Sequence, residues 1–296
     1  MSETPYRSGY VTLLGKPNAG KSTLLNALVG QKVSIVSNKA QTTRRRIAGV
    51  VQGPNYQIVF IDTPGIHEPH TALGKVMREE AREALGGVDL VVVVVDASKR
   101  PDETDRRIAQ MVVGYFPIFL CMNKMDKLRA DKVVMSVEGY TQLYGVGDDY
   151  MLTTATQERN LDKLMEGIVA KMPEGEPLFD EDTYTDQTVR FIASELIREK
   201  VLIATREEVP HATAVQIREW EEEEDKITIY ADIIVEKQGQ KAIVIGNKGD
   251  FIKEVGTQAR KEIEALVEKH VFLDLHVKVR EDWRMNPRMV HELQNE

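Results

Sequence analysis

Apolar runs alternate with amphipathic stretches from Tyr10 to about Lys171. The runs that predict strands lie at 10–14, 47–52, 56–61, 89–95, 117–122 and 149–153. Apolar residues with helical spacing lie at about 21–29, 74–85, 102–113, 131–143 and 160–171. Strands separated by helices predict an α/β fold, a mostly parallel six-stranded sheet with helices on both faces. Runs 47–52 and 56–61 are too close together for a helical crossover, so we expect an antiparallel hairpin there.

The pattern changes after residue 172. The following stretch is rich in proline and acidic residues, which predicts a linker over 173–186. The features expected beyond it are a helix over about 187–204, apolar-alternating runs over 212–220 and 226–236, a continuation over 241–245 toward Gly246, a helical region over 249–269 and a last strand over 271–280. These elements predict an α+β unit. We therefore expect one domain over 1–172 and a second over 187–296.

Composition limits the kind of protein. No stretch approaches the roughly 18 uncharged apolar residues of a membrane span, and residues 1–5 show no signal-peptide pattern. The single cysteine, Cys121, lies in an apolar run, which indicates a buried structural thiol and excludes a cysteine-based metal site. We expect a reducing, cytoplasmic compartment.

The net charge of −8 argues against a protein that coats nucleic acid through bulk charge. The acidic excess is concentrated in 181–225, whereas acidic and basic side chains balance over 226–296. A basic face in the second half is therefore compatible with the acidic total.

Residues 15–23 read Gly-Lys-Pro-Asn-Ala-Gly-Lys-Ser-Thr, which fits the P-loop pattern between a strand and a helix. Backbone N–H groups of such a loop surround phosphates, and the helix N-terminus adds positive potential. We expect Lys21 to neutralise the β- and γ-phosphates as the catalytic charge, and Ser22 to ligate Mg²⁺. The expected phosphate-binding residues are Gly15, Lys16, Pro17, Asn18, Ala19, Gly20, Lys21, Ser22 and Thr23.

A second motif, Asp62-Thr-Pro-Gly65, follows strand 56–61. The Asp62 carboxylate is expected in the Mg²⁺ shell, and the Gly65 N–H is expected at the γ-phosphate. Loss of that phosphate on hydrolysis would release the loop that follows.

The motif Asn123-Lys124-Met125-Asp126 follows strand 117–122 and predicts guanine recognition. The Asp126 carboxylate can accept hydrogen bonds from N1–H and the exocyclic amine of guanine, and adenine presents no such pair of donors. Strand 149–153 leads to Thr154-Ala155, where a backbone N–H is expected at the guanine O6. Together with the P-loop, this order of motifs predicts GTP.

A polar segment over 37–46 separates the first helix from the hairpin. A threonine in this position closes over Mg²⁺ when the γ-phosphate is present. Thr43 is the preferred residue and Thr42 the alternative. A further alternative is that both are turn threonines.

The chain resembles the translation-factor-related GTPases, and within them it is similar to the Era family of bacterial ribosome-assembly GTPases. The resemblance rests on the P-loop of residues 15–23, Gln41-Thr-Thr-Arg44, Asp62-Thr-Pro-Gly-Ile-His67, Asn123-Lys-Met-Asp126 and the 244–260 segment. The last segment resembles a KH domain of the bacterial type. Thr154 stands where the family usually has serine, and Asn247 where many KH loops have lysine.

The KH resemblance implies an RNA-binding site. Its GxxG loop is Gly246, Asn247, Lys248 and Gly249, and such loops clamp about four nucleotides. Lys253 and Arg260 follow where phosphates would run. Ile245, Phe251, Ile252 and Val255 are expected to line an apolar groove for unstacked bases.

The resemblance implies a slow GTPase that cycles between GTP and GDP with Mg²⁺, and K⁺ near Asn18. His67 stands where many GTPases have a glutamine that orients water, and no side-chain general base is assigned. The implied partners are 16S ribosomal RNA near its 3′ end and the assembling 30S subunit. The protein is expected to be a monomer in the cytoplasm, with peripheral association at the inner face of the cell membrane.

Three other functions compete with this interpretation. An RNA-modification GTPase shares the P-loop and Thr-Thr-Arg segment but brings a folate- or cysteine-bearing module. A constitutive RNA-binding scaffold would use GTP only structurally. A P-loop kinase has no use for Asn123-Lys-Met-Asp126.

Overall fold

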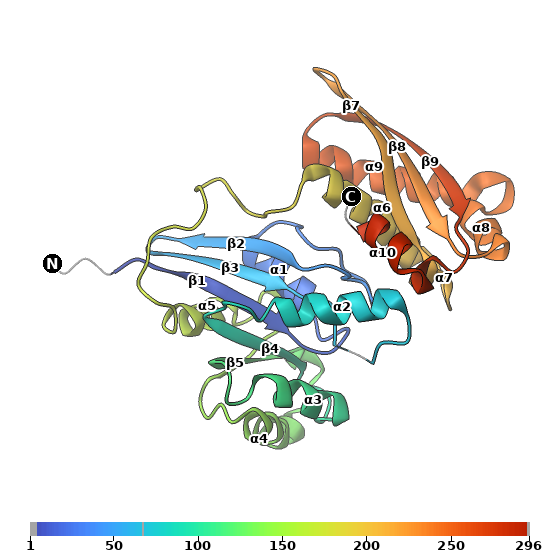
Figure 1. Ribbon diagram of the computed structural model, residues 1–296. Coiled ribbons are helices and arrows are strands. Elements are labelled where there is room, and N and C mark those ends of the chain that lie inside the picture. The colour runs from blue at the N-terminus through green and yellow to red at the C-terminus, as the bar shows by residue number, and fades with distance from the viewer. Residues whose placement is uncertain (1–4, 67, 295–296) are drawn as a thin grey trace. The chain divides into compact units, whose positions relative to one another are not determined.

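The computed structural model describes residues 5–66 and 68–294 (Figure 1). The chain divides into two compact units. The first unit consists of Met1–Ser34, Thr43–Glu68 and Met77–Asp186, and the second of Ile35–Thr42, Pro69–Val76 and Gln187–Glu296. His67, which stands where many GTPases have a glutamine that orients water, lies outside the described residues.

The first unit is built on a six-stranded sheet. Its strands are β1 (Arg7–Leu14), β2 (Ile47–Gly53), β3 (Tyr56–Asp62), β4 (Leu90–Asp96), β5 (Ile118–Asn123) and β6 (Tyr150–Leu152). Their spatial order is β2-β3-β1-β4-β5-β6, with β2 antiparallel to β3 and the other described pairs parallel. The predicted mostly parallel sheet and its antiparallel hairpin are confirmed.

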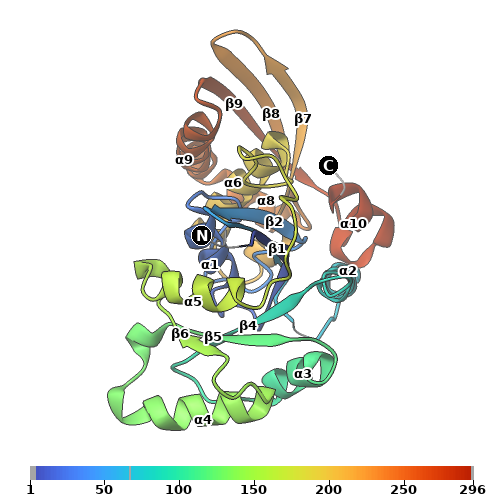
Figure 2. The same cartoon turned by 90° about the vertical axis from the view of Figure 1, so that its left-hand side faces the viewer.

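Helices cover both faces of this sheet. The helices of this unit are α1 (Lys21–Val29), α3 (Glu103–Val112), α4 (Val133–Tyr144), α5 (Leu161–Val169) and the part of α2 (Ala72–Glu83) from Met77 onward. α1 and α5 lie on one face, and α3 and α4 lie on the other (Figure 2). Because β1, β3, β4, β5 and β6 run parallel, their carboxyl ends lie at one edge of the sheet, where ligands of such sheets bind.

The strand β4 lies at the centre of one hydrophobic core of the first unit. All seven residues of this strand are buried, and such a continuous apolar run suits a parallel strand covered on both faces. Val91, Val93 and Val95 pack with Ile108 of α3 and Tyr140 of α4. Cys121 of β5 is also buried, which raises the pKa of its thiol to about 12 and keeps it protonated at neutral pH.

The segment predicted as a linker lies along β2 and β3 within the first unit. Gln57 of β3 is fully buried, and its Oε1 accepts the N–H groups of Leu178 at 2.6 Å and Phe179 at 2.8 Å. Its Nε2 donates to the Phe179 carbonyl at 2.9 Å. The Val50 N–H donates to the Tyr184 carbonyl at 3.0 Å. Hydrogen bonds from Gln57 and Val50 to the backbone of this segment thus hold it against the sheet despite its polar composition.

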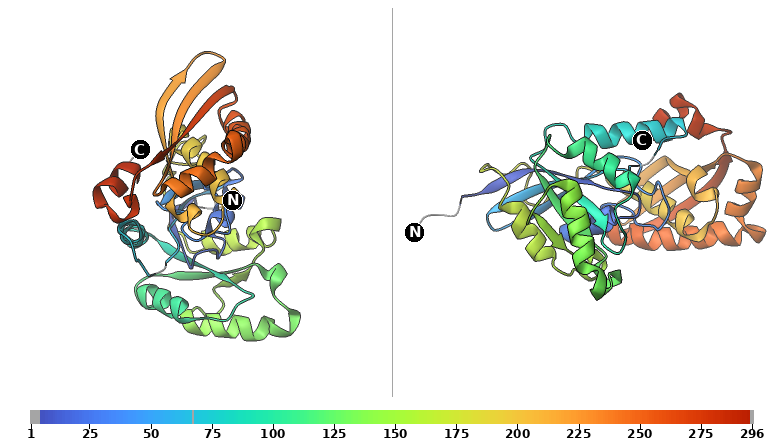
Figure 3. Two further views of the ribbon diagram at one scale, coloured as in Figure 1. Left: turned by 90° about the vertical axis from the view of Figure 1, so that its right-hand side faces the viewer. Right: turned by 90° about the horizontal axis from the view of Figure 1, so that it is seen from below.

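The second unit contains a three-stranded sheet with helices on one face. Its elements are α6 (Val189–Ala204), α7 (Val209–Ala212), β7 (Ala214–Glu222), β8 (Lys226–Val235), α8 (Gln238–Ile245), α9 (Asp250–Val267), β9 (His270–Val279) and α10 (Pro287–Gln294). The order is β7-β8-β9, with β7 antiparallel and β9 parallel to β8. α6 and α9 pack on the same face of the sheet, which the turned views of Figure 3 also show.

Two helices and one strand-like continuation differ from the predictions. Residues 241–245 form the end of α8, and the short helices α7 and α10 were not predicted. Trp283 shows how the C-terminal residues are held, because it is 1% exposed and its indole N–H donates to the Ala212 carbonyl at 2.8 Å. Among the described helices, none combines the length and apolar character that crossing a bilayer requires.

We predict that Gln57→Ala releases residues 176–185 from the sheet. The substitution removes the partner of two part-buried N–H groups and of one carbonyl, at about 1–3 kcal/mol for each group that water then cannot reach. Hydrogen exchange of Leu178 and Phe179 should accelerate, and the free energy of unfolding should fall. Gln52→Ala is the matched control, since Gln52 donates to the Asp180 and Glu181 carbonyls at exposed positions. Equal effects of the two substitutions would contradict the prediction.

Candidate functional site

The P-loop joins β1 to α1 at the carboxyl edge of the sheet. Lys21 is buried, and its Nζ donates to the carbonyls of Gly15 and Lys16, both at 3.2 Å. Burial lowers the pKa of Lys21, and the Asp62 carboxylate opposes this shift. A cation held this way gains from an anion placed inside the loop, as a nucleotide phosphate would be.

The side chain of Lys16 points to a different place. Its Nζ forms ion pairs with Asp102 at 2.8 Å and Asp105 at 2.6 Å, at the start of α3. Burial tends to lower the pKa of Lys16, but the two carboxylates outweigh it and the pKa is raised. Lys16 can therefore meet a phosphate through its backbone, while its side chain fixes the loop against α3.

The three predicted magnesium ligands lie together. The Ser22 hydroxyl donates to Asp62 Oδ2 at 2.6 Å and hydrogen-bonds the Thr43 hydroxyl at 2.8 Å. Asp62 Oδ2 also accepts from Ser34 at 3.1 Å and from Thr43 at 3.4 Å. Burial raises the pKa of Asp62, opposed by Lys21 and by the three hydroxyl donors.

This oxygen cluster fits a magnesium ion. Asp62 Oδ1 is buried and has no hydrogen-bond partner among the described residues. Two hydroxyls and one carboxylate are hard oxygen donors, which Mg²⁺ prefers, and the ion commonly keeps water and substrate phosphate as its remaining ligands. The residues present are thus sufficient for the kind of site that the sequence predicts.

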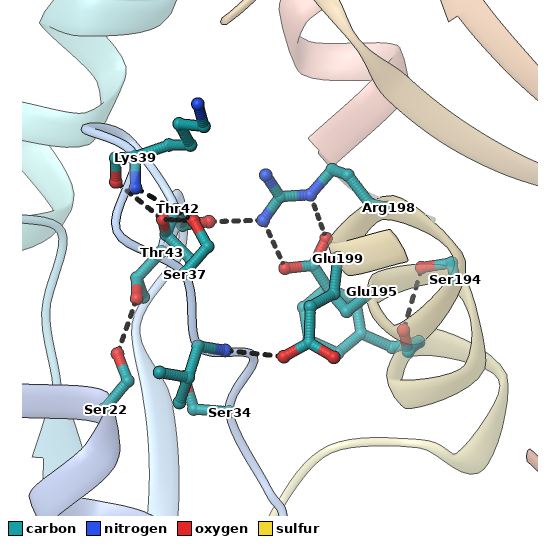
Figure 4. A network of polar contacts seen from close by, with 12 residues as sticks. Ser22, Ser34, Ser37, Lys39, Thr42, Thr43, Ser194, Glu195, Arg198 and Glu199 are labelled. Atoms are coloured by element: carbon teal, nitrogen blue, oxygen red, sulfur yellow. Dashed lines mark hydrogen bonds and ion pairs between the residues drawn. The ribbon is translucent and has the colours of Figure 1, made fainter. Parts of the chain in front are cut away.

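Thr42 and Thr43 point in different directions, as Figure 4 shows. The Thr43 hydroxyl lies at Ser22, whereas the Thr42 hydroxyl donates to the Lys39 carbonyl at 2.7 Å and also meets Ser37 at 2.7 Å. Thr42 therefore braces its own turn, and the geometry favours Thr43 at the metal.

Gly65 brings the loop after β3 against the P-loop. A Cβ on Gly65 would lie 2.7 Å from the Pro17 backbone, so no larger residue fits without moving that backbone. The next N–H, that of Ile66, donates to the Gly15 carbonyl at 3.2 Å. This close approach holds the Gly65 backbone against the P-loop, the segment that the sequence predicts at the phosphates.

Asn123 ties the base-recognition segments to the P-loop. Its Nδ2 donates to the Ala19 carbonyl at 3.1 Å, and its Oδ1 accepts the Ala155 N–H at 3.0 Å. Because the Thr154 N–H donates to the Arg159 carbonyl at 3.3 Å, the backbone donors of both predicted residues are occupied. Ala155 must exchange its partner in order to meet a guanine O6.

Lys124 and Asp126 differ in their contacts: Lys124 bonds neighbouring loops, whereas Asp126 is exposed. Lys124 Nζ donates to the Asn18 carbonyl and to Asp96 Oδ2, the latter at 3.0 Å. Burial disfavours the charged form of Asp96, but bonds from Ser98 and Lys124 outweigh it, and the pKa of Asp96 is lowered. Asp126 is exposed, which leaves its carboxylate accessible to a base.

Sequence reasoning missed Asp96, Asp102 and Asp105. Asp96 ends the buried strand β4, and Asp102 caps α3 by accepting the N–H groups of Thr104 and Asp105. An acid at the carboxyl end of a buried parallel strand is a usable signal, and so is an acid before a helical pattern. Neither pattern reveals that Lys124 and Lys16 are the partners.

The GxxG loop in the second unit joins α8 to α9. Gly246 has a φ of 77°, and a Cβ there would lie 2.8 Å from the Phe251 nitrogen, so both the backbone angle and the space require glycine. Lys248 also has a positive φ, of 52°. This tight turn exposes backbone close to the start of α9.

A groove of about 270 Å³ runs beside this helix, between α9 and β9. It is lined by Ile252, Lys253, Gly256, Thr257, Arg260, Leu273, Asp274 and Leu275. The predicted residues Ile252, Lys253 and Arg260 are brought together here. The prediction for Val255 was wrong, because its side chain is 2% exposed and belongs to the core. Ile245 and Phe251 pack against that core from its edge.

These two sites define the class, a P-loop GTPase followed by a KH domain. A family model described as a 50S ribosome-binding GTPase matches residues 10–124, and a KH domain model matches residues 208–284.

Full-length relatives identify the family. The chain is 45% identical to the GTPase Era of Heliobacterium modesticaldum, over 95% of this chain and 94% of that protein. It is 44% identical to the GTPase Era of Geobacter metallireducens, over 99% of each. A crystal structure of Era in complex with MgGDPNP and nucleotides 1506–1542 of 16S ribosomal RNA is 41% identical, with a TM-score of 0.94 over 98% of this chain and 99% of that chain. The chain belongs to the Era family of GTPases, and the resemblance noted in the sequence is confirmed.

We predict that Ser22→Ala weakens binding of a GTP analogue by about 10–100-fold in Mg²⁺, the range known for groups that tune metal sites. The loss should largely disappear in EDTA, because the hydroxyl acts through the metal. Ser136→Ala is the control, since the Ser136 hydroxyl donates to the Ala97 carbonyl and not to an expected magnesium ligand. Calorimetry with and without Mg²⁺ measures both variants. A loss of the same size in EDTA would show that Ser22 acts only on folding of the loop.

Proposed function

We propose that the chain is a GTP-hydrolysing switch. The observation that carries this proposal is the convergence of Lys21, Ser22, Thr43 and Asp62 at the P-loop. In the bound state, Ser22, Thr43 and Asp62 would hold Mg²⁺, which supplies positive charge to the phosphate oxygens. Lys21 neutralises the phosphates, and the Gly65 N–H contacts the γ-phosphate.

Hydrolysis in this proposal depends on positioning and charge. Phosphoryl transfer needs little covalent chemistry from the protein, so a site that fixes the phosphates and neutralises them lowers the barrier. No side-chain general base is assigned, and slow intrinsic turnover follows. K⁺ binding at Asn18 stays a prediction.

We propose that the second unit binds 16S ribosomal RNA near its 3′ end and assists maturation of the 30S subunit. The bound RNA fragment in the related Era structure supports this target. The GxxG turn and the groove with Lys253 and Arg260 support single-stranded RNA as the ligand. Since ribosomal subunits assemble in the cytoplasm, we propose the cytoplasm as the compartment of this protein, and its monomeric state stays a prediction. Association with the inner face of the membrane stays a prediction.

We propose that the two activities form one cycle. GTP orders residues 37–46 and 63–80, RNA affinity changes, and hydrolysis reverses the change. A nucleotide shifts such an equilibrium only when it contacts the two arrangements differently. The γ-phosphate satisfies this condition, since Thr43 and Gly65 are the residues proposed to sense it.

We predict that Asp126→Ala abolishes selectivity for GTP over ATP. The carboxylate is proposed to accept two hydrogen bonds from guanine, and bonds to a charged group contribute about 1.5–3 kcal/mol each. GTP affinity should therefore fall by about 100-fold or more, with ATP affinity unchanged. Asp131→Ala is the control, because this exposed carboxylate pairs with Arg129. Retained GTP selectivity in the Asp126 variant would overturn the assignment of guanine recognition.

We predict that Arg260→Ala weakens binding of a single-stranded 16S 3′-end oligonucleotide by about tenfold. Removing one phosphate contact should also reduce the slope of log affinity against log salt by about 0.7. Lys261→Ala removes the same charge from the next residue of α9, which does not line the groove. Fluorescence anisotropy across a salt series measures both variants, with GTP affinity as a folding check. Equal losses for the two variants would point to bulk charge and against the groove.

A further inference from the structure

Helix α6 carries three consecutive charged residues that are all buried. Arg198 and Glu199 are each 2% exposed, and Lys200 is 7% exposed. Burying a charge is costly unless it is paired and hydrogen-bonded. The partners of these three side chains therefore reveal what the helix is built to hold.

Arg198 and Glu199 hold the two ends of segment 35–42, which belongs to the same unit as α6. Glu199 Oε1 accepts the Val36 N–H at 2.8 Å, and Arg198 Nη2 donates to the Thr42 carbonyl. Arg198 is itself fixed by two bonds of 2.6 Å to the Glu195 carboxylate. Figure 4 shows the guanidinium between Glu195 and Thr42.

Between those ends, the segment is a braced turn. The Lys39 N–H donates to the Ser37 hydroxyl at 3.1 Å, and the Thr42 hydroxyl bonds both Ser37 and the Lys39 carbonyl. Such a turn moves as one piece. Since one planar peptide group contains the Thr42 carbonyl and the Thr43 nitrogen and Cα, a displacement of the Thr43 backbone also shifts or rotates the carbonyl that Arg198 holds.

Lys200 connects Glu199 to α9, the helix that follows the GxxG loop. Its Nζ donates to Glu199 Oε2 at 2.8 Å and to Glu262 of α9. Burial alone would lower the pKa of Lys200, but the two carboxylates outweigh it and the pKa is raised. α9 begins at the GxxG loop, and its groove face carries Lys253 and Arg260.

We propose that Arg198 and Glu199 are positioning residues for Thr43, and that Lys200 and Glu262 link segment 35–42 to the RNA-binding helix α9. This inference rests on the proposed function, since it needs GTP at the P-loop and RNA at the groove. A second arrangement is available to Arg198, because its Nη1 is buried and lacks a hydrogen-bond partner among the described residues. Movement of segment 35–42 can offer that group an acceptor.

The measured quantity is the coupling between nucleotide and RNA. It is the ratio of RNA affinities with a non-hydrolysable GTP analogue and with GDP, and it must equal the ratio by which RNA changes the relative affinity of the two nucleotides. The full chain is titrated with a single-stranded 16S 3′-end oligonucleotide in each nucleotide state. For the unmodified protein, we expect a ratio of at least about fivefold, at the lower end of known couplings.

Glu262→Gln is the mild test, because this side chain is 38% exposed and the amide keeps its shape. The coupling ratio should fall to within about twofold of one, a near-complete loss of a coupling of this size. Glu254→Gln is the matched control, since it makes the same charge change on α9 and Glu254 bonds only Gln258 among the described residues. The control should shift RNA affinity equally in both nucleotide states and leave the ratio intact.

Arg198→Lys tests the positioning role directly. It keeps the charge but loses the bidentate contact, so kcat for GTP hydrolysis should fall severalfold while GDP affinity is unchanged. In a protein that already carries Thr43→Ala, adding Arg198→Lys should not lower kcat any further, because Arg198 acts through Thr43. A merely structural role would lower GDP affinity and add to the Thr43 loss.

The outcomes separate the inference from the proposed function. RNA and GTP binding without coupling in the unmodified protein overturns the inference and the proposed GTP–RNA cycle, and leaves the two binding activities standing. Coupling that stays intact in Glu262→Gln overturns the inference and leaves the proposed function standing. Absence of RNA binding in both nucleotide states overturns both. Loss of coupling in Glu262→Gln, with the ratio preserved in Glu254→Gln, supports the proposed link.

Discussion

The buried carboxylate of Asp62 is the group on which the nucleotide site depends. A carboxylate out of water requires compensation, and here it receives it from three hydroxyls and from the Lys21 ammonium. Ser22 lies at the start of α1, and Ser34 and Thr43 lie in the stretch between α1 and β2. One buried charge therefore brings the P-loop, the polar segment after α1 and the end of β3 to a single point.

Hydrogen bonds from side chains also hold the loops around the Asn123-Lys124-Met125-Asp126 motif in place. Asn123 satisfies the Ala19 carbonyl and the Ala155 N–H, and Lys124 satisfies the Asn18 carbonyl and Asp96. These side chains connect loops at the ends of neighbouring strands, where no sheet hydrogen bond can do so. The first two residues of the Asn123-Lys124-Met125-Asp126 motif thus hold loops in place, whereas Asp126 is the residue proposed to contact the base.

The sequence predicted what is local and periodic. The spacing of apolar residues predicted the approximate bounds of β1 to β6 and of α6. The motifs predicted that Ser22 and Asp62 lie in one site with Thr43 as the preferred threonine, and the three side chains do lie together. It missed what depends on tertiary partners. Residues 173–186 look like a free linker because their composition is polar, yet Gln57 holds their backbone against β3. Val255 was expected in the groove because helical spacing cannot tell two neighbouring apolar faces of α9 apart.

The grouping of segment 35–42 with the second unit was also beyond sequence reasoning, because the side chains that bond it, Arg198 and Glu199, come from a helix far along the chain. A buried ion pair adds little net stability, because the desolvation of two charges offsets their attraction, and apolar residues often replace it without loss. Stability alone therefore does not explain Arg198, Glu199 and Lys200 on a helix whose other buried positions are mostly apolar. Directional hydrogen bonds specify one position of a backbone segment, which apolar packing does not. The cost of burying these charges is thus better understood as the cost of fixing segment 35–42, which directly precedes Thr43.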